Sequence, residues 1–212
     1  RLEQVRREAT QDNLTGLANR AYFMNQLDAA LRDDDAAPSG SLLILRLSDL
    51  AGINKRAGRE AADEVLRRIG KAMSEIVSKN PGAAPARLNG ADFALLLPGL
   101  DDPTAPAEKL LDTLRDLVAA DLIEPGKVGH ISSGHYRHGE SAGHLLAHLD
   151  ATLATAEGQG SLAWARAESN QEKGVASNAD WKKLLEGAIS SQRLRLIDFP
   201  VAGNSGQMLH LE

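Results

Sequence analysis

The chain has 212 residues, of which 24 are Lys or Arg and 29 are Asp or Glu, so its formal net charge at pH 7 is −5. This balance excludes bulk electrostatic attraction to nucleic acid, and the absence of cysteine excludes disulfides and thiolate chemistry. No apolar run approaches the ~20 residues that cross a bilayer. Because the chain starts abruptly at Arg1 and stops at Glu212 without a closing element, we expect it to be part of a longer protein.

The first eleven residues, 1–11, are charged and helix-favouring, and their apolar residues Leu2, Val5 and Ala9 recur at three- and four-residue steps. This pattern is typical of the end of a longer helix or coiled coil, although a solvated N-terminal helix has the same pattern. A polar break that contains glycine follows at 12–20. We therefore expect a helix that enters a separate domain.

Beyond this break, some stretches have apolar residues at helical spacing and others have continuous or alternating apolar runs. Strands alternate with helices and two strands form a hairpin, which predicts an α/β three-layer domain with a central mixed sheet. The hairpin turn is expected at Asn89-Gly90, because Asn-Gly between strand-like segments favours a tight turn with positive φ at both residues. The expected elements are a helix at 19–32, a strand at 42–47, a helix at 58–78, the hairpin, a helix at 105–119, a strand at 128–136, a helix at 141–157 and a strand at 161–165.

The C-terminal part has a different composition. Residues 167–178 are polar and lack periodicity, so they are interpreted as a linker. A helix carrying Trp181 and two short strands, at 194–201 and 208–211, are expected after it. This tail has too little apolar surface to form a core alone, so it should dock on the first domain or open a second one.

Four stretches, in this order along the chain, resemble the motifs of GGDEF domains, the diguanylate cyclase family. The resemblance implies the nucleotidyl cyclase-like three-layer fold for residues 12–166, with a signalling helix at 1–11. The stretches are Asp-Asn-Leu-Thr-Gly-Leu-Ala-Asn-Arg at 12–20, the segment 45–63 with Ile53, Asn54, Gly58 and Asp63 kept, the hairpin 87–93, and the late helix 149–157. The hairpin itself is degenerate and consists of Asn89, Gly90, Ala91, Asp92 and Phe93.

The family joins two GTP molecules, a reaction that needs metal ions held by carboxylates and cations on the phosphates. The resemblance places the first metal carboxylate at Arg46 and the second at Asp92, one methylene shorter than the usual glutamate. It places the turn acid at Ala91 and the phosphate-binding lysines at Ala51 and Glu157. A cation repels a metal ion and an anion repels a phosphate. We therefore expect no catalytic residue, no metal site and no cyclase activity.

Some ligand-binding groups are kept. Asn54 and Asp63 match residues that hold the guanine base in active relatives, and both suit its Watson–Crick edge. Arg46 can contact a phosphate in place of a metal ion. The plainer interpretation is that Asn54 caps or braces the following loop and that Asp63 is a solvated helix residue. No cofactor is expected, and Mg²⁺ only accompanies residual GTP binding.

The tail 179–212 resembles the start of an EAL domain, the cyclic-di-GMP phosphodiesterase and receptor fold, with Phe199-Pro200 in place of the usual Gln-Pro. The terminal Leu211-Glu212 matches the start of the EAL motif but also suits a cloning remnant. A degenerate GGDEF domain before an EAL domain resembles the LapD-type cyclic-di-GMP receptors. This resemblance implies a cytoplasmic domain of a bacterial inner-membrane protein.

The implied partners are the protein's own EAL domain, an upstream HAMP-like helix and a second copy in a homodimer, but no nucleic acid. Cyclic di-GMP would be bound by the EAL domain of the longer protein and not by this part. Three hypotheses follow: an inert regulatory domain that relays signals through domain contacts, which we favour, a GTP-binding allosteric module, and a residual diguanylate cyclase. The first predicts no GTP affinity, the second predicts metal-independent affinity without turnover, and the third predicts cyclic di-GMP.

Overall fold

The computed structural model describes residue 7 and residues 9–33, 36–167, 200–202 and 208–211. The chain forms two compact units, Arg1–Ser169 and Asn170–Glu212. In the second unit, β7 (Pro200–Ala202) and β8 (Met208–Leu211) pair antiparallel, and the strand expected at 194–201 otherwise lies outside the described residues. The expected helix at Trp181 and the start of the N-terminal helix, 1–6, also lie outside them.

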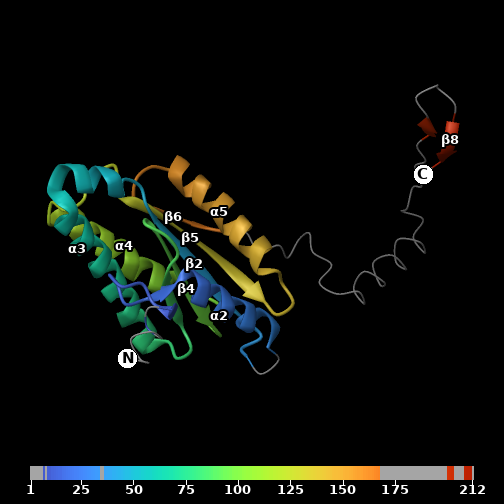
Figure 1. The fold of residues 1–212 in the computed structure, drawn as a ribbon, viewed down its shortest axis with the longest axis horizontal. Coiled ribbons are helices and arrows are strands. Elements are labelled where there is room, and N and C mark those ends of the chain that lie inside the picture. The colour runs from blue at the N-terminus through green and yellow to red at the C-terminus, as the bar shows by residue number, and fades with distance from the viewer. Residues whose placement is uncertain (1–6, 8, 34–35, 168–199, 203–207, 212) are drawn as a thin grey trace. The chain divides into compact units, whose positions relative to one another are not determined.

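A six-stranded sheet forms the centre of the first unit, in the order β1-β3-β4-β2-β5-β6 (Figure 1). The outer pairs, β1 with β3 and β5 with β6, are parallel, and the inner pairs are antiparallel. The mixed sheet expected from the sequence is therefore confirmed. The strands are β1 (Ala18–Asn19), β2 (Ser39–Leu47), β3 (Ala84–Arg87), β4 (Asp92–Pro98), β5 (Gly129–Arg137) and β6 (Ala163–Arg166).

Two helices cover each face of the sheet, and this explains why β2 is apolar on both faces (Figure 1). Alternate side chains of a strand point to opposite faces. Leu43 and Leu45 pack on the α3 and α4 side, whereas Leu42 and Ile44 pack on the α2 and α5 side. Arg46, the next residue but one after Ile44, lies on the same α2 and α5 side. The helices are α2 (Arg20–Arg32), α3 (Leu50–Lys79), α4 (Thr104–Ala119) and α5 (Ala142–Gly158).

Helix α3 begins eight residues before the expected start at 58. Asp49 caps it by accepting a hydrogen bond of 2.8 Å from the backbone N–H of Gly52. Gly58 interrupts the helix with φ 86° and ψ 170°, a conformation open essentially to glycine alone. The first part of α3 buries only Ile53, so it has no apolar periodicity from which to predict a helix.

The hairpin between β3 and β4 exists, but the predicted turn is wrong, because neither Asn89 nor Gly90 has a positive φ. The loop is longer than two residues, and Arg87 pairs with Phe93 across it. The side-chain oxygen of Asn89 accepts hydrogen bonds of 2.9 Å from the backbone N–H groups of Ala91 and of Asp92. A side-chain acceptor thus replaces the backbone acceptor of a tight turn.

No helix in the described ranges is both long and apolar enough to cross a lipid bilayer.

Candidate functional site

The break at 12–20 folds into a hydrogen-bonded turn around Asp12. One oxygen of Asp12 accepts hydrogen bonds from the backbone N–H of Thr15 at 2.9 Å and from its hydroxyl at 2.7 Å. Burial of Asp12 favours its neutral form, but the hydrogen bonds from Thr15 and the positive charge of Arg87 outweigh this and lower the pKa of the Asp12 carboxyl. At the end of the turn, Asn19 caps α2 and donates a 2.9 Å hydrogen bond to the carbonyl of Ala9.

Arg87, the last residue of β3, connects this turn to the hairpin loop. Its Nη1 lies 3.3 Å from both carboxylate oxygens of Asp12. Its Nε donates to the carbonyl of Asn89 at 3.1 Å, and its Nη2 donates to the carbonyl of Gly90 at 2.8 Å. The Arg87 side chain is only 13% exposed, so these contacts are partly shielded from water. The entry segment and the hairpin loop are therefore held by one side chain.

A cavity of about 680 Å³ lies between α3 and the hairpin loop. The structure brings six of the sequence-predicted positions together here: Ala51, Asn54, Asp63, Asn89, Gly90 and Ala91. The volume is within the range of small-molecule sites. The other lining residues are Leu47, Ser48, Asp49, Leu50, Arg59, Ala62, Leu66 and Arg87.

Asn54 and Asp63 lie on α3 on either side of the interruption at Gly58. The side chain of Asn54 is exposed and makes no hydrogen bond to any residue in the described ranges, which gives the interpretation as a cap or brace no support. Asp63 is half-buried, and its carboxylate lies 4.0 Å from Arg67. Both groups are thus placed to contact a molecule in the cavity.

Arg46 lies elsewhere, on the sheet face covered by α2 and α5, and does not line this cavity. It pairs in register with Asp92 across β2 and β4, and its Nε and Nη2 donate to the two Asp92 oxygens at 2.8 and 3.1 Å. Its Nη2 also donates to Asp150 at 2.9 Å, and its Nη1 lies 3.9 Å from Glu157. The hydrogen bond to Asp92 raises the already high pKa of Arg46, so the guanidinium stays charged.

The charge of Arg46 is therefore engaged by carboxylates, and a phosphate contact would have to compete with them. Asp92 and Glu157, two of the other predicted positions, belong to this cluster and not to the cavity. Among the described residues, no three or more carboxylate or imidazole groups are placed to hold a metal ion.

Three functional candidates escaped the sequence reasoning. Arg59 lines the cavity and has no ion pair within the described part of the chain. Asp150 lies in the quoted late-helix motif, but nothing in the motif indicates its contact with Arg46. His130 is buried, with Nδ1 3.3 Å from the hydroxyl of Ser48 and Nε2 2.9 Å from the carbonyl of Gly160, and no local pattern points to it.

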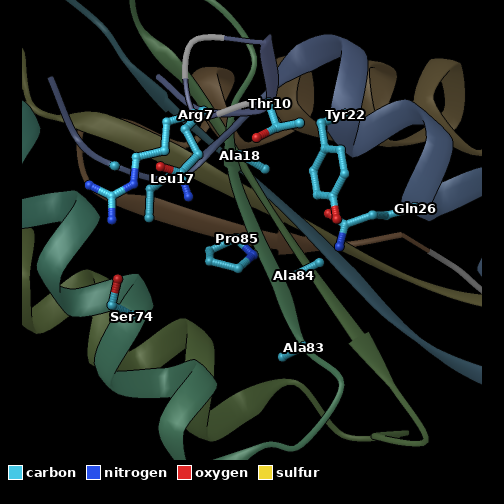
Figure 2. A pocket seen from close by; sticks show the side chains of 12 residues that line it. Arg7, Thr10, Leu17, Ala18, Tyr22, Gln26, Ser74, Ala83, Ala84 and Pro85 are labelled. Carbon is cyan, nitrogen blue, oxygen red and sulfur yellow. The ribbon is translucent and has the colours of Figure 1, made fainter. Parts of the chain in front are cut away.

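A second hollow, of about 480 Å³, opens at the N-terminal end of β3 (Figure 2). The side chains that line it include those of Arg7, Tyr22, Gln26 and Pro85 (Figure 2). None of the sequence-predicted site residues lines it, and among the described residues its lining holds no carboxylate or imidazole. Tyr22 and Arg7 are the titratable side chains that the described lining supplies.

Comparison with known proteins identifies the family and the fold. The family described as diguanylate cyclase, GGDEF domain, matches residues 9–162. The chain is 28% identical over 211 residues to the RNase E specificity factor CsrD of Escherichia coli K12, a match that covers 98% of this chain and 33% of CsrD. The chain therefore spans about a third of that relative.

Two solved structures have the same fold. The S helix-GGDEF-EAL structure of Vibrio cholerae LapD bound to c-di-GMP has a TM-score of 0.68 at 23% identity, covering 99% of this chain and 49% of that chain. The coiled coil and GGDEF domain of Caulobacter crescentus DgcB, in complex with c-di-GMP, has a TM-score of 0.64 at 25% identity, covering 78% of this chain and 90% of that chain. With the family match extending over most of its length, the chain belongs to the GGDEF family.

Proposed function

We propose that this chain supplies a catalytically inactive GGDEF regulatory domain to a bacterial cyclic-di-GMP signalling protein. The domain relays signals between an upstream helix and a C-terminal EAL domain through domain contacts. The observation that carries this proposal is the bidentate pair between Arg46 and Asp92, because the resemblance places metal carboxylates at these two positions.

The residues do not fit the metal ions that the family reaction needs. A guanidinium lies where an anionic ligand is required, and it already binds the one carboxylate that remains. Ala91 has no group to polarise or deprotonate a substrate, and Ala51 and Glu157 supply no cation for a phosphate. No step of phosphodiester formation can be assigned to these side chains.

The proposed division of the chain is a signalling helix at 1–11, a GGDEF domain at 12–166, a linker at 167–178 and the start of an EAL domain at 179–212. The length of the match to LapD and to CsrD supports this arrangement, since both extend over nearly the whole chain. We propose the EAL domain, a HAMP-like helix and a second copy of the chain as partners. Cyclic di-GMP would bind to the complete EAL domain, on the cytoplasmic side of the inner membrane.

A second function, binding of GTP as an allosteric ligand, is favoured by one observation. Asn54, Asp63 and Arg59 line the same cavity of about 680 Å³. An amide and a carboxylate suit the Watson–Crick edge of guanine, and an arginine suits a phosphate. Such binding would not require a metal ion.

Calorimetric titration of the purified chain with GTP, with and without Mg²⁺, tests both functions when the same samples are then assayed for cyclic di-GMP. No heat and no product supports an inactive relay. Heat that is independent of Mg²⁺, without product, supports the allosteric module, and Asn54→Ala or Asp63→Ala should then weaken binding about tenfold or more. Asp112→Ala, on the exposed surface of α4, is the matched control.

Synthesis of cyclic di-GMP would overturn the proposal. The variant Arg46→Asp sharpens this test, because it restores one carboxylate while Ala51 and Glu157 remain. We expect it to stay inactive. Rapid synthesis by this variant would show that the loss of one ligand, and not several losses together, accounts for the inactivity.

A further inference from the structure

A series of polar side chains leads from the entry segment into the hairpin loop. Asp12 contacts Arg87 at 3.3 Å, and Arg87 donates to the carbonyl of Asn89 at 3.1 Å. The side-chain amide of Asn89 in turn donates to Oδ2 of Asp92 at 2.8 Å. Asn89 therefore joins the contacts of Arg87, made to its backbone carbonyl, to those of Asp92, made to its side chain.

The series continues from Asp92 through the sheet to α5. Asp92 accepts both hydrogen bonds of the Arg46 guanidinium, and Arg46 donates to Asp150 at 2.9 Å while Glu157 lies 3.9 Å away. Asp92 is on β4, Arg46 is on β2 and Asp150 is on α5. The contacts thus connect Asp12, near the start of the domain's sequence, to Asp150, near its end. We call this set the relay network: Asp12, Arg87, Asn89, Asp92, Arg46 and Asp150.

Two inner members of the relay network, Arg87 and Asp92, are shielded from water, whereas Asn89, which links them, is exposed. The side chains of Arg87 and Asp92 are each 13% exposed, whereas Asp150, at the end of the network, is 64% exposed. Charges near the interior interact more strongly than surface charges, because solvent screens them less. Loss of one inner contact therefore changes the electrostatic environment of the next charge in the network.

We infer that the relay network couples the entry segment to α5 energetically, so that a disturbance at Asp12 or Arg87 changes the stability of α5. Arg46 is the connecting group: it is a fixed cation that neutralises Asp92 and Asp150, which would otherwise repel each other. This inference rests on the proposed relay function and names its route inside the domain. A network of contacts is not by itself a coupling, so the coupling must be measured.

Hydrogen exchange of the α5 amides in the 212-residue chain measures this coupling directly. Four proteins are compared: the unaltered chain, Arg87→Met, Arg46→Met and the double variant. We expect Arg87→Met to accelerate exchange in α5 about fivefold more than in α4 when Arg46 is present, and to produce no such difference in the Arg46→Met background. Exchange in α4, which contributes no residue to the relay network, is the internal control. Arg56→Met, which removes a single exposed ion pair with Glu124 at 3.3 Å, is the matched control variant.

Coupling is reciprocal, so a second variant tests the same inference from the other end. Asp150→Asn changes an exposed side chain and preserves its shape, so the domain should fold, and it should accelerate exchange at the hairpin residues 88–92. Unchanged α5 exchange in Arg87→Met, or equal acceleration with and without Arg46, would overturn the inference.

These measurements contain no nucleotide, so their failure differs from failure of the proposed function. If exchange in α5 is uncoupled but the chain makes no cyclic di-GMP, the inactive domain stands and another route must carry the signal. If the chain makes cyclic di-GMP while α5 is coupled, the relay network stands and the proposed inactivity is wrong.

Discussion

Replacement of Arg87 by methionine is the most informative perturbation of the domain, because one side chain links two segments that are distant in sequence. Methionine keeps the apolar stem but removes all the donors. The lost contacts are those to Asp12 at 3.3 Å, to the carbonyl of Asn89 at 3.1 Å and to that of Gly90 at 2.8 Å. Because Arg87 is only 13% exposed, water does not fully replace these partners.

The expected cost follows from these contacts. Each of the two hydrogen bonds to carbonyls contributes about 1 kcal/mol net, and the long, partly shielded pair with Asp12 contributes about 1 kcal/mol. Some of this is recovered because Asp12 keeps its hydrogen bonds from Thr15. We therefore expect the free energy of unfolding to fall by about 2–3 kcal/mol. For a domain of this size this lowers the melting temperature by roughly 4–12 °C.

Urea denaturation at several pH values provides the assay, with Arg56→Met as the control that loses one exposed pair and should change stability by less than about 0.5 kcal/mol. The pKa of Asp12 is lowered in the folded protein, so its carboxylate contributes stability above the unfolded pKa of about 3.9, and this is lost as the pH falls through the folded pKa. Arg87→Met should lose less stability than the unaltered chain as the pH falls, because Arg87 helps to lower the pKa of Asp12. A cost as small as that of Arg56→Met would refute the reasoning.

Three other substitutions test specific features of the fold. Gly58→Ala should lower the free energy of unfolding, measured by thermal unfolding, by about 1–3 kcal/mol, because alanine is strained at φ 86°. The control Gly143→Ala, in the exposed first turn of α5, should raise it by about 0.5–1 kcal/mol. Burial raises the pKa of Tyr136 to about 12, so its contribution to stability is complete below about pH 10 and is lost as the pH rises towards 12. Tyr136→Phe should abolish this alkaline loss and leave stability at pH 7 unchanged or higher, because the hydroxyl makes no hydrogen bond with any described residue; a marked loss at pH 7 would contradict this.

Much of the fold is predictable because the apolar pattern is strong where the elements are most buried. Strand β2 has a continuous apolar run since both of its faces are covered, and α2 has Phe23, Leu27 and Leu31 on one face. The start of α3 was missed because it buries only Ile53. The turn was predicted with the wrong geometry because an Asn side chain can itself supply the acceptor, and a dipeptide preference does not report that.

Some features of the candidate site were likewise predictable from the sequence, and others were not. Asn54 and Asp63 were identified from the resemblance of segment 45–63 to a family motif, and the structure places both at one cavity. The partners of Arg46 could not be identified by spacing. Its contact with Asp92 depends on the register between β2 and β4, and its contact with Asp150 joins residues 104 positions apart. Register and packing of distant elements are properties of the assembled sheet and not of any local pattern.

The substitutions in this chain depend on one another physically. If Arg46 alone were replaced by aspartate, the new carboxylate would lie opposite Asp92 in the sheet and near Asp150, and the cation that pairs with both would be lost. Conversely, Arg46 without Asp92 would leave a partly buried guanidinium without its closest partner. The two residues thus form one ion pair, and such a contact requires no metal ion. In the proposed regulatory domain, the contacts of Arg46 would hold β2, β4 and α5 together without substrate or metal ions.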